Sequence, residues 1–253
     1  MRMTIVLLAA LLLSLSACNS KQPGNHDQAA NPSQQAKPVD PTTAASISGV
    51  VIFAGTPPKP QKIDMGQDPA CGNQPAYDES YVVKDGKLAN VFVYVKAAET
   101  QPHGPFVEVV VTRPIEQRGC RYHPHVLGVM TGHEVTIINA DDTTHNIHPM
   151  PTQSKQWNES QLPKAQDIVK KFDKPEIMIP IKCNQHPWMK MYLNVVDTPW
   201  FAVTDENGKF EITGLPPGEY TLAAVHEKLG EQTMKISVGP KDSKTADFTF
   251  KAQ

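Results

Sequence analysis

Short runs in which apolar and polar residues alternate recur along the chain from residue 46 onward, and they predict β-strands. No stretch keeps a 3.6-residue apolar period over several turns, so the pattern predicts an all-β protein. The polar stretch 150–172 fits neither period and is expected to form a short helix or an irregular loop. The strand-like runs are 46–55, 90–96, 105–114, 133–141, 176–183 and 191–197.

The last part of the chain has a denser strand-and-turn pattern, FAVTDENGKFEITGLPPGEYTLAAVHEKLGEQTMKISV, at 201–238. It resembles the carboxypeptidase regulatory-like (transthyretin-like) sandwich, whose motif includes TD.NG.F.I.GLPPG.YTL. That module usually begins with a G.V...G.P strand, which SGVVIFAGTPP supplies about 150 residues earlier. The resemblance therefore implies a small sandwich that either encloses the central residues or follows them in tandem, with a boundary near Thr198–Pro199.

The N-terminus has the layout of an export signal. Arg2 precedes an apolar run from Ile5 to Leu15, which is too short to span a bilayer. Leu15-Ser16-Ala17-Cys18 resembles a bacterial lipobox, which predicts a signal peptide at 1–17 and a lipidated Cys18. Residues 18–45 are rich in Gln, Asn, Pro and Ala and predict a disordered tether. The protein is therefore expected in the cell envelope, lipid-anchored and facing the periplasm or the outer membrane.

Charge and motifs exclude several classes of function. The net charge of −2 gives no basic field for nucleic acid. The sequence has no G-x-S-x-G elbow and no phosphate-binding loop, and HEKLG at 226–230 lacks the second histidine of a zinc-protease helix. We therefore expect a protein that is not an enzyme by itself.

Export also constrains the cysteines, because thiols tend to pair in an oxidising compartment. Without Cys18, the remaining three are Cys71, Cys120 and Cys183. If a metal binds Cys183, then Cys71 and Cys120 are left to form a disulfide. Pairing of either one with Cys183 would abolish a thiolate site, and the sequence leaves the connectivity open.

The stretch KCNQHPWMKM, residues 182–191, gathers soft ligands on one short loop. Cys183 and His186 provide a thiolate and an imidazole, and the thioether of Met189 can approach the same point. A third strong ligand must come from elsewhere, and His145 lies just after a predicted strand, in DDTTHNIHP. Two histidines, one cysteine and a weak axial methionine are the ligands of electron-transfer copper.

These motifs, HN.H followed 38 residues later by C..HP.M, resemble those of the cupredoxins, and amicyanin and plastocyanin in particular. The resemblance implies a Greek-key sandwich at 105–198 that binds one type 1 copper ion. The implied ligands are His145, Cys183, His186 and Met189, with Met191 as the alternative axial ligand.

The same resemblance assigns roles around the metal. Asn146 would tie the two ligand loops together, and His186 would be the imidazole nearer the surface, through which electrons pass. Pro187 and Trp188 beside it would form an apolar docking patch, although Trp188 equally fits core packing.

The sequence thus predicts a cupredoxin-type domain at 105–198 and a small sandwich at 199–253, with 46–104 as an N-terminal β region that can belong to the small sandwich. The expected role is the transfer of single electrons between envelope redox partners, such as a cytochrome or a membrane-associated oxidoreductase. The rival roles are copper handling or delivery, and a structural or adhesive surface module whose copper site is degenerate.

Overall fold

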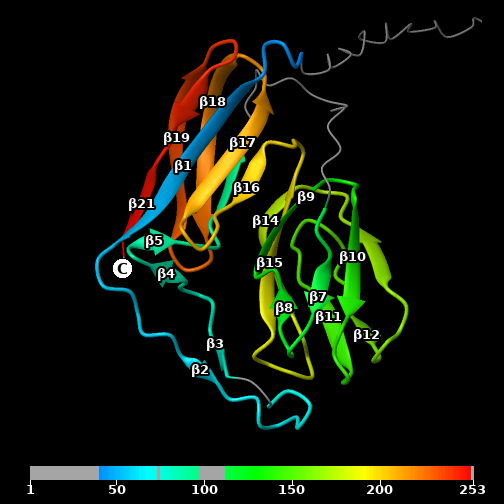
Figure 1. The fold of residues 1–253 in the computed structure, drawn as a ribbon. Helices are drawn as coiled ribbons and strands as arrows, with labels where there is room; N and C mark the ends of the chain where they lie inside the picture. The colour runs from blue at the N-terminus through cyan, green and yellow to red at the C-terminus, as the bar shows by residue number, and fades with distance from the viewer. Residues whose placement is uncertain (1–39, 73–74, 97–111, 252–253) are drawn as a thin grey trace, which may run out of the picture. The chain divides into compact units, whose positions relative to one another are not determined.

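The computed structural model describes residues 40–72, 75–96 and 112–251. The predicted signal peptide, Cys18, nearly all of the tether and most of the predicted strand 105–114 lie outside these residues. Every regular element in the described ranges is a β-strand (Figure 1). Among the described residues, no helix is long and apolar enough to cross a membrane.

Ten strands form a small sandwich of two sheets. One sheet has the order β17-β1-β5-β4, with β20 and β21 pairing with β1, and the other has the order β16-β6-β18-β19. The strands of this sandwich are β1 (Ala45–Ala54), β4 (Val83–Lys84), β5 (Lys87–Leu88), β6 (Phe92–Val95), β16 (Phe201–Val203), β17 (Lys209–Leu215), β18 (Gly218–His226), β19 (Gly230–Val238), β20 (Ser243–Thr245) and β21 (Phe248–Lys251).

The interior of the small sandwich follows from strand alternation. In β17 the residues Phe210 and Ile212 face inward while their neighbours are exposed. Trp200 is fully buried at the centre of this core, and its indole N–H donates to the carbonyl of Gly214 at 3.0 Å. Burial of the ring with its one polar atom satisfied makes Trp200 a major contributor to stability.

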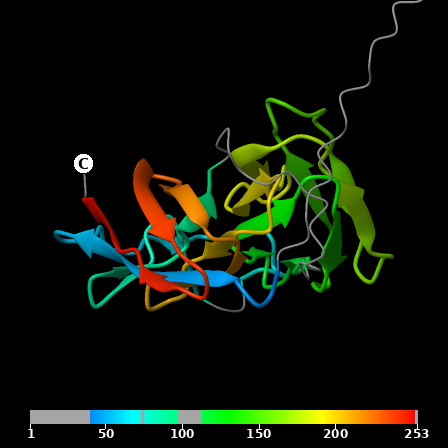
Figure 2. The same cartoon turned by 90° about the horizontal axis from the view of Figure 1, so that it is seen from above.

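The small sandwich is built from both ends of the described chain. β1 pairs antiparallel with β17 and parallel with β20 and β21, while β6 lies between β16 and β18. The red C-terminal strands accordingly run beside the blue β1 in both views (Figures 1 and 2). The amide of Val95 donates to the carbonyl of Trp200 at 2.9 Å, so the chain leaves this sandwich and returns to it at adjacent points.

The strands between these two points form a larger sandwich. Its sheets have the orders β13-β10-β7-β8 and β12-β11-β14-β15-β9, and they enclose a second core. The strands are β7 (Ile115–Gln117), β8 (Tyr122–His123), β9 (Val126–Met130), β10 (Glu134–Asn139), β11 (His145–Pro149), β12 (Glu159–Gln161), β13 (Ile168–Lys171), β14 (Glu176–Lys182) and β15 (Lys190–Val196).

The polar stretch 150–172 forms no helix; it contributes the short strands β12 and β13, one to each sheet. Hydrogen bonds from side-chain amides, rather than a periodic apolar face, help to hold this region in position. Gln161, which is 2% exposed, donates to the carbonyls of Ile137 and Gln166, both at 3.1 Å. Buried polar bonds of this kind leave no signature in the hydrophobic pattern.

A further pair of short strands, β2 (Lys62–Ile63) and β3 (Ala76–Tyr77), precedes the larger sandwich in the chain. The segment between them belongs to the larger core rather than to the small sandwich, because Met65 and Cys71 are buried there.

Candidate metal centre

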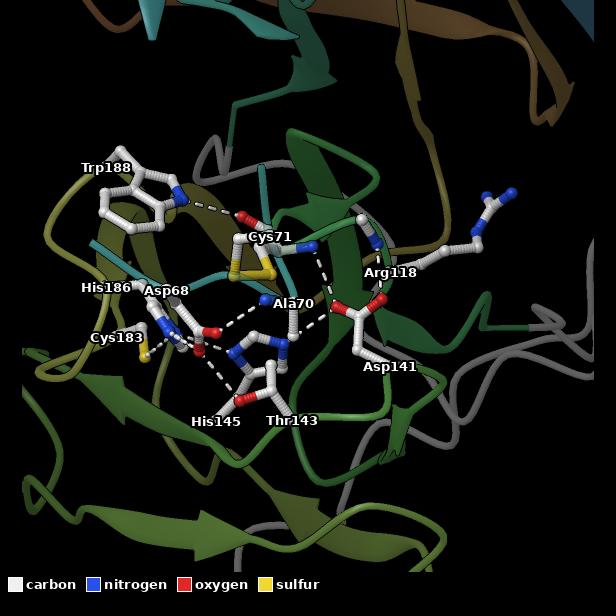
Figure 3. The surroundings of a disulfide bond; sticks show 12 residues. Asp68, Ala70, Cys71, Arg118, Asp141, Thr143, His145, Cys183, His186 and Trp188 are labelled. Atoms are coloured by element: carbon white, nitrogen blue, oxygen red, sulfur yellow. Dashed lines mark hydrogen bonds and ion pairs between the residues drawn. A yellow bond between two sulfur atoms is a disulfide. The ribbon is translucent and has the colours of Figure 1, made fainter. Parts of the chain in front are cut away.

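Three potential metal ligands lie together at one end of the larger sandwich (Figure 3). His145 is the first residue of β11, and Cys183 and His186 lie in the loop from β14 to β15. The two histidine Nδ1 atoms are 2.9 Å apart, and Cys183 Sγ lies 3.7 Å from His186 Nδ1. All three residues are buried, with at most 4% of their surface exposed.

Backbone bonds fold the loop after β14 so that Cys183, His186 and Met189 are buried. The amide of Cys183 donates to the carbonyl of Met189 at 3.2 Å, and the amide of Met189 donates to the carbonyl of His186 at 2.9 Å. These bonds close the loop on itself before β15 begins at Lys190. The compact C-x2-H spacing therefore brings thiol and imidazole to the same point.

Asn146 connects the two ligand-bearing segments. Its Oδ1 accepts from the amide of Asn184 at 2.7 Å and from the thiol of Cys183 at 3.3 Å. Its Nδ2 donates to Asn158 Oδ1 at 2.6 Å. The residue after His145 thus fixes the position of the cysteine loop.

Each histidine presents its other nitrogen to a carboxylate. His145 Nε2 lies 2.8 Å from Asp141 Oδ2, and His186 Nε2 lies 3.0 Å from Asp68 Oδ2. A carboxylate at Nε2 holds the ring proton there, which leaves Nδ1 to face the space between the ligands.

The sequence motifs did not predict that Asp141 and Asp68 lie at this site. Asp141 could have been found, because it lies four residues before a predicted ligand in the same loop. Asp68 could not, because it is separated from His186 by 118 positions.

Asp141 is itself held by a turn of two consecutive amides. Gly119 and Cys120, with φ values of 60° and 53°, donate their N–H groups to its two oxygens at 2.6 and 2.8 Å. Successive backbone N–H groups in a turn of this kind form a concavity that binds anions. Burial works against ionisation of Asp141, but the bonds from His145, Cys120 and Gly119 lower the pKa of its carboxyl.

The thiol of Cys183 is also perturbed. Burial opposes the thiolate, yet the hydrogen bond with His145 and the nearby amides of Asn146, His186 and Gln185 lower its pKa to about 6. For His145, burial opposes protonation, but bonds to Asp141 and Cys183 raise the pKa. The site therefore favours a thiolate beside an imidazole, the pair that soft or borderline metal ions select.

The donor set fits a transition metal. A trigonal centre with bonds of about 2.0 Å to nitrogen and about 2.3 Å to sulfur would separate the donors by about 3.5 and 3.7 Å. The sulfur–nitrogen separation of 3.7 Å matches, and the imidazoles at 2.9 Å would move apart by about half an ångström. Two nitrogens and one sulfur facing one another, with both rings anchored from behind, form a candidate metal centre.

Both candidate axial methionines are buried in the same core. Met189 lies in the loop, its carbonyl bonded to the amide of Cys183, and is 1% exposed. Met191 lies within β15, opposite Ile181, and is 0% exposed. Met189 is thus tied to the ligand loop itself, whereas Met191 belongs to the strand that leaves it.

His186 is the more exposed of the two imidazoles, but only slightly, since His145 is 0% exposed. His186 itself is 4% exposed, and Asp68 lies against its outer nitrogen. Pro187 next to it is exposed. Trp188 is partly buried, packs 5.2 Å from the His186 ring and donates from its indole to the carbonyl of Cys120 at 3.0 Å. The predicted docking residues therefore differ: one is accessible, and the other mainly supports the site.

Cys71 and Cys120 form a disulfide, and Cys183 is a free, buried thiol. This is the pairing expected if Cys183 is reserved for a metal. Figure 3 shows the bridge beside Asp68, His145 and Asp141. The Cys71 sulfur lies within 4.8 Å of a ring nitrogen of His186 and a carboxylate oxygen of Asp68. The Cys120 sulfur lies within 4.8 Å of a ring nitrogen of His145 and a carboxylate oxygen of Asp141.

Comparison with protein families matches the carboxypeptidase regulatory-like domain to residues 192–251. Comparison with curated protein sequences finds no match. Among solved structures, a Cu-containing nitrite reductase from Thermus scotoductus SA-01 is similar, at 19% identity over 41% of this chain and a TM-score of 0.32. This chain spans a quarter (25%) of that protein.

Two smaller copper proteins are similar over most of their own length. The purple cupredoxin from Nitrosopumilus maritimus matches at 22% identity over 32% of this chain and 97% of its own, with a TM-score of 0.28. A variant of amicyanin in its Cu(I) form matches at 21% identity over 33% of this chain and 80% of its own, with a TM-score of 0.29. The predicted all-β fold is confirmed by the strands of the described residues, and the predicted carboxypeptidase regulatory-like resemblance is confirmed by the family match.

Proposed function

We propose that this protein binds one copper ion through His145, Cys183 and His186, with Met189 as a weak fourth ligand, and carries single electrons. One observation carries the proposal: two buried imidazoles present Nδ1 to each other at 2.9 Å beside a buried thiol of lowered pKa. Packing alone does not require both rings to turn the same nitrogen inward and the other one onto a carboxylate.

The side chains of the site act by holding the ligands still. Copper, when bound, supplies the one-electron chemistry by alternating between Cu(I) and Cu(II). Asp141 and Asp68 fix the two rings, and Asn146 fixes the cysteine loop. A rigid, water-excluded frame reduces the rearrangement that accompanies each change of charge.

The location and the partners belong to the same proposal. An export signal with Cys18 in a lipobox would anchor the protein in the cell envelope, and the stretch up to residue 45 would act as a tether. The partners would be envelope redox proteins, a cytochrome or a membrane-associated oxidoreductase. Such a protein acts as a carrier and is not an enzyme by itself. Exposed Pro187 beside the ligand loop is the place where we expect a partner to approach.

A visible spectrum of the protein with Cu(II) tests the proposal. We expect an intense thiolate-to-copper band that Cys183→Ser abolishes, because only the thiolate can donate that charge. Asn184→Ser, next to it on the exposed side of the loop, is the matched control and should keep the band.

Other outcomes of that experiment separate the rivals. If the protein remains colourless and binds Cu(I) tightly, the result would favour copper delivery over electron transfer. Absence of copper binding would contradict both roles and favour a structural or adhesive module.

A further inference from the structure

The outer edge of His186 is covered by a segment that lies far away in the sequence. We call residues Asp64–Cys71, between β2 and β3, the cover segment. Within it, Asp68 Oδ2 accepts from Thr143 Oγ1 at 2.9 Å and lies 3.0 Å from His186 Nε2. Its Oδ1 accepts from the amide of Ala70 at 2.8 Å, which fixes the direction of the carboxylate.

Asp68 thereby bridges the two loops that carry the ligands. Thr143 lies two residues before His145, and His186 lies in the loop after β14. A single carboxylate oxygen therefore contacts both sides of the pocket from outside. The Asp68 side chain is only 23% exposed, and both bonds hold it in the same rotamer.

Independent anchors hold the cover segment on the larger sandwich. Met65 and Cys71 are 5% and 4% exposed and belong to its core. Cys71 is also bonded covalently to Cys120, whose amide in turn binds Asp141. The disulfide thus joins the segment that carries one carboxylate to the turn that binds the other.

We propose that Asp68 is a positioning residue for His186 and that the cover segment, fastened by the Cys71–Cys120 disulfide, closes the metal site to solvent. The inference deepens the proposed function and rests on the same site. With the cover in place, neither imidazole presents a nitrogen to water, because Asp141 and Asp68 occupy both outer positions. Entry of water, thiol reagents or chelators then requires the cover to lift.

The reactivity of Cys183 in the metal-free protein measures this closure directly. Each variant is treated with an alkylating reagent at fixed pH, and labelling is followed by mass spectrometry on the peptide that contains Cys183. We expect labelling of Asp68→Ala to be about tenfold faster than in the wild type, since a charge-assisted bond that holds the cover is lost. The double variant Cys71→Ser with Cys120→Ser should be at least as fast.

Two further variants separate positioning from a general loosening of the fold. Asp68→Asn keeps an acceptor oxygen for His186 but loses the acceptor for the amide of Ala70, so its labelling rate should lie between those of the wild type and Asp68→Ala. Gln67→Ala removes the neighbouring exposed side chain and should behave as the wild type. Equal labelling of Asp68→Ala and Gln67→Ala, within about twofold, would overturn the proposal, as would wild-type labelling as fast as in denaturant.

A second measurement uses the copper-loaded protein. The half-life of the bound metal against a Cu(I) chelator should fall about tenfold in Asp68→Ala and remain unchanged in Gln67→Ala. The labelling assay needs no metal, so the two proposals fail separately. Slow, Asp68-dependent labelling without copper binding would contradict the function and leave the cover, whereas copper binding with Asp68-independent labelling and metal loss would contradict the cover.

Discussion

At the scale of single residues, the two sandwiches treat a buried histidine in opposite ways. His145 meets Asp141, and that bond helps to raise its pKa although burial opposes protonation. His226 is 1% exposed and lies against Tyr81 and Phe250, with burial as the main reason that its pKa falls to about 4. The His145 ring is hydrogen-bonded to a carboxylate at the candidate metal centre, whereas the His226 ring is held neutral among aromatic side chains.

The depressed pKa of His226 predicts a loss of stability in acid. In the unfolded chain a histidine titrates near 6.5, so below that pH the unfolded state takes up a proton that folded His226 refuses until about pH 4. The free energy of unfolding should therefore decrease as the pH falls from about 6.5 to about 4, by about 2 kcal/mol between pH 7 and pH 5.

Urea unfolding at several pH values checks this prediction. His226→Gln should remove most of the pH dependence of the free energy of unfolding between pH 7 and pH 5. His133→Gln, at a partly exposed position, should retain it. A wild-type slope that persists in His226→Gln would assign the acid sensitivity to other groups.

At the scale of elements, the sequence pattern located most of the longer strands, including the fully buried β6, but missed β9. The runs at 46–55, 133–141, 176–183 and 191–197 correspond closely to β1, β10, β14 and β15. β9, with all five residues buried, has no alternation to detect. In β9, Gly128 leaves room for Phe92 and Phe201, whose ring atoms lie 2.6 Å from where a Cβ would stand. Such close approach of distant aromatic residues cannot be deduced from a local pattern.

Another long-range contact links the end of β18 to the start of β9. Glu227 Oε1 lies 2.5 Å from His125 Nε2, and both side chains are 2% exposed. Removal of one partner leaves the other buried and unsatisfied, so Glu227→Ala should lower the free energy of unfolding by about 2–4 kcal/mol. Glu206→Ala, at an exposed ion pair, should change it by less than about 0.5 kcal/mol. Similar effects of the two variants in chemical denaturation would contradict this assignment.

At the scale of the whole molecule, the sequence predicted the histidine and cysteine donors that the structure brings together but not what surrounds them. His145, Cys183 and His186 are found by motif because the ligand loops are short and continuous. Asp68 lies in a segment with no regular pattern, and it reaches the site only because β2, β3 and the disulfide direct that segment there. A motif identifies ligands within one loop, whereas the position of the cover segment depends on contacts between segments far apart in the sequence.

The topology of the small sandwich predicts that its N-terminal part cannot fold alone. A chain that ends at Asp197 keeps β1, β5 and β6 but loses β16 to β21, including every strand that pairs with β1 except β5. We expect β1, β5 and β6 of that chain, residues 45–54 and 87–95, to be cleaved readily in limited proteolysis, while the same residues resist in the full protein. Resistance of both chains would show that the N-terminal strands are stable without their C-terminal partners.

The parallel pairing of β1 with β21 also determines when the protein can finish folding. Val51 lies opposite Phe248, so β1 must wait during synthesis for a partner strand far along the chain. Contacts over such long separations are slow to form, because a large loop must be closed first. The larger sandwich needs no residue beyond β15 for its own sheets. The candidate metal centre can therefore assemble before the small sandwich is complete, because that sandwich still lacks β21 at this stage.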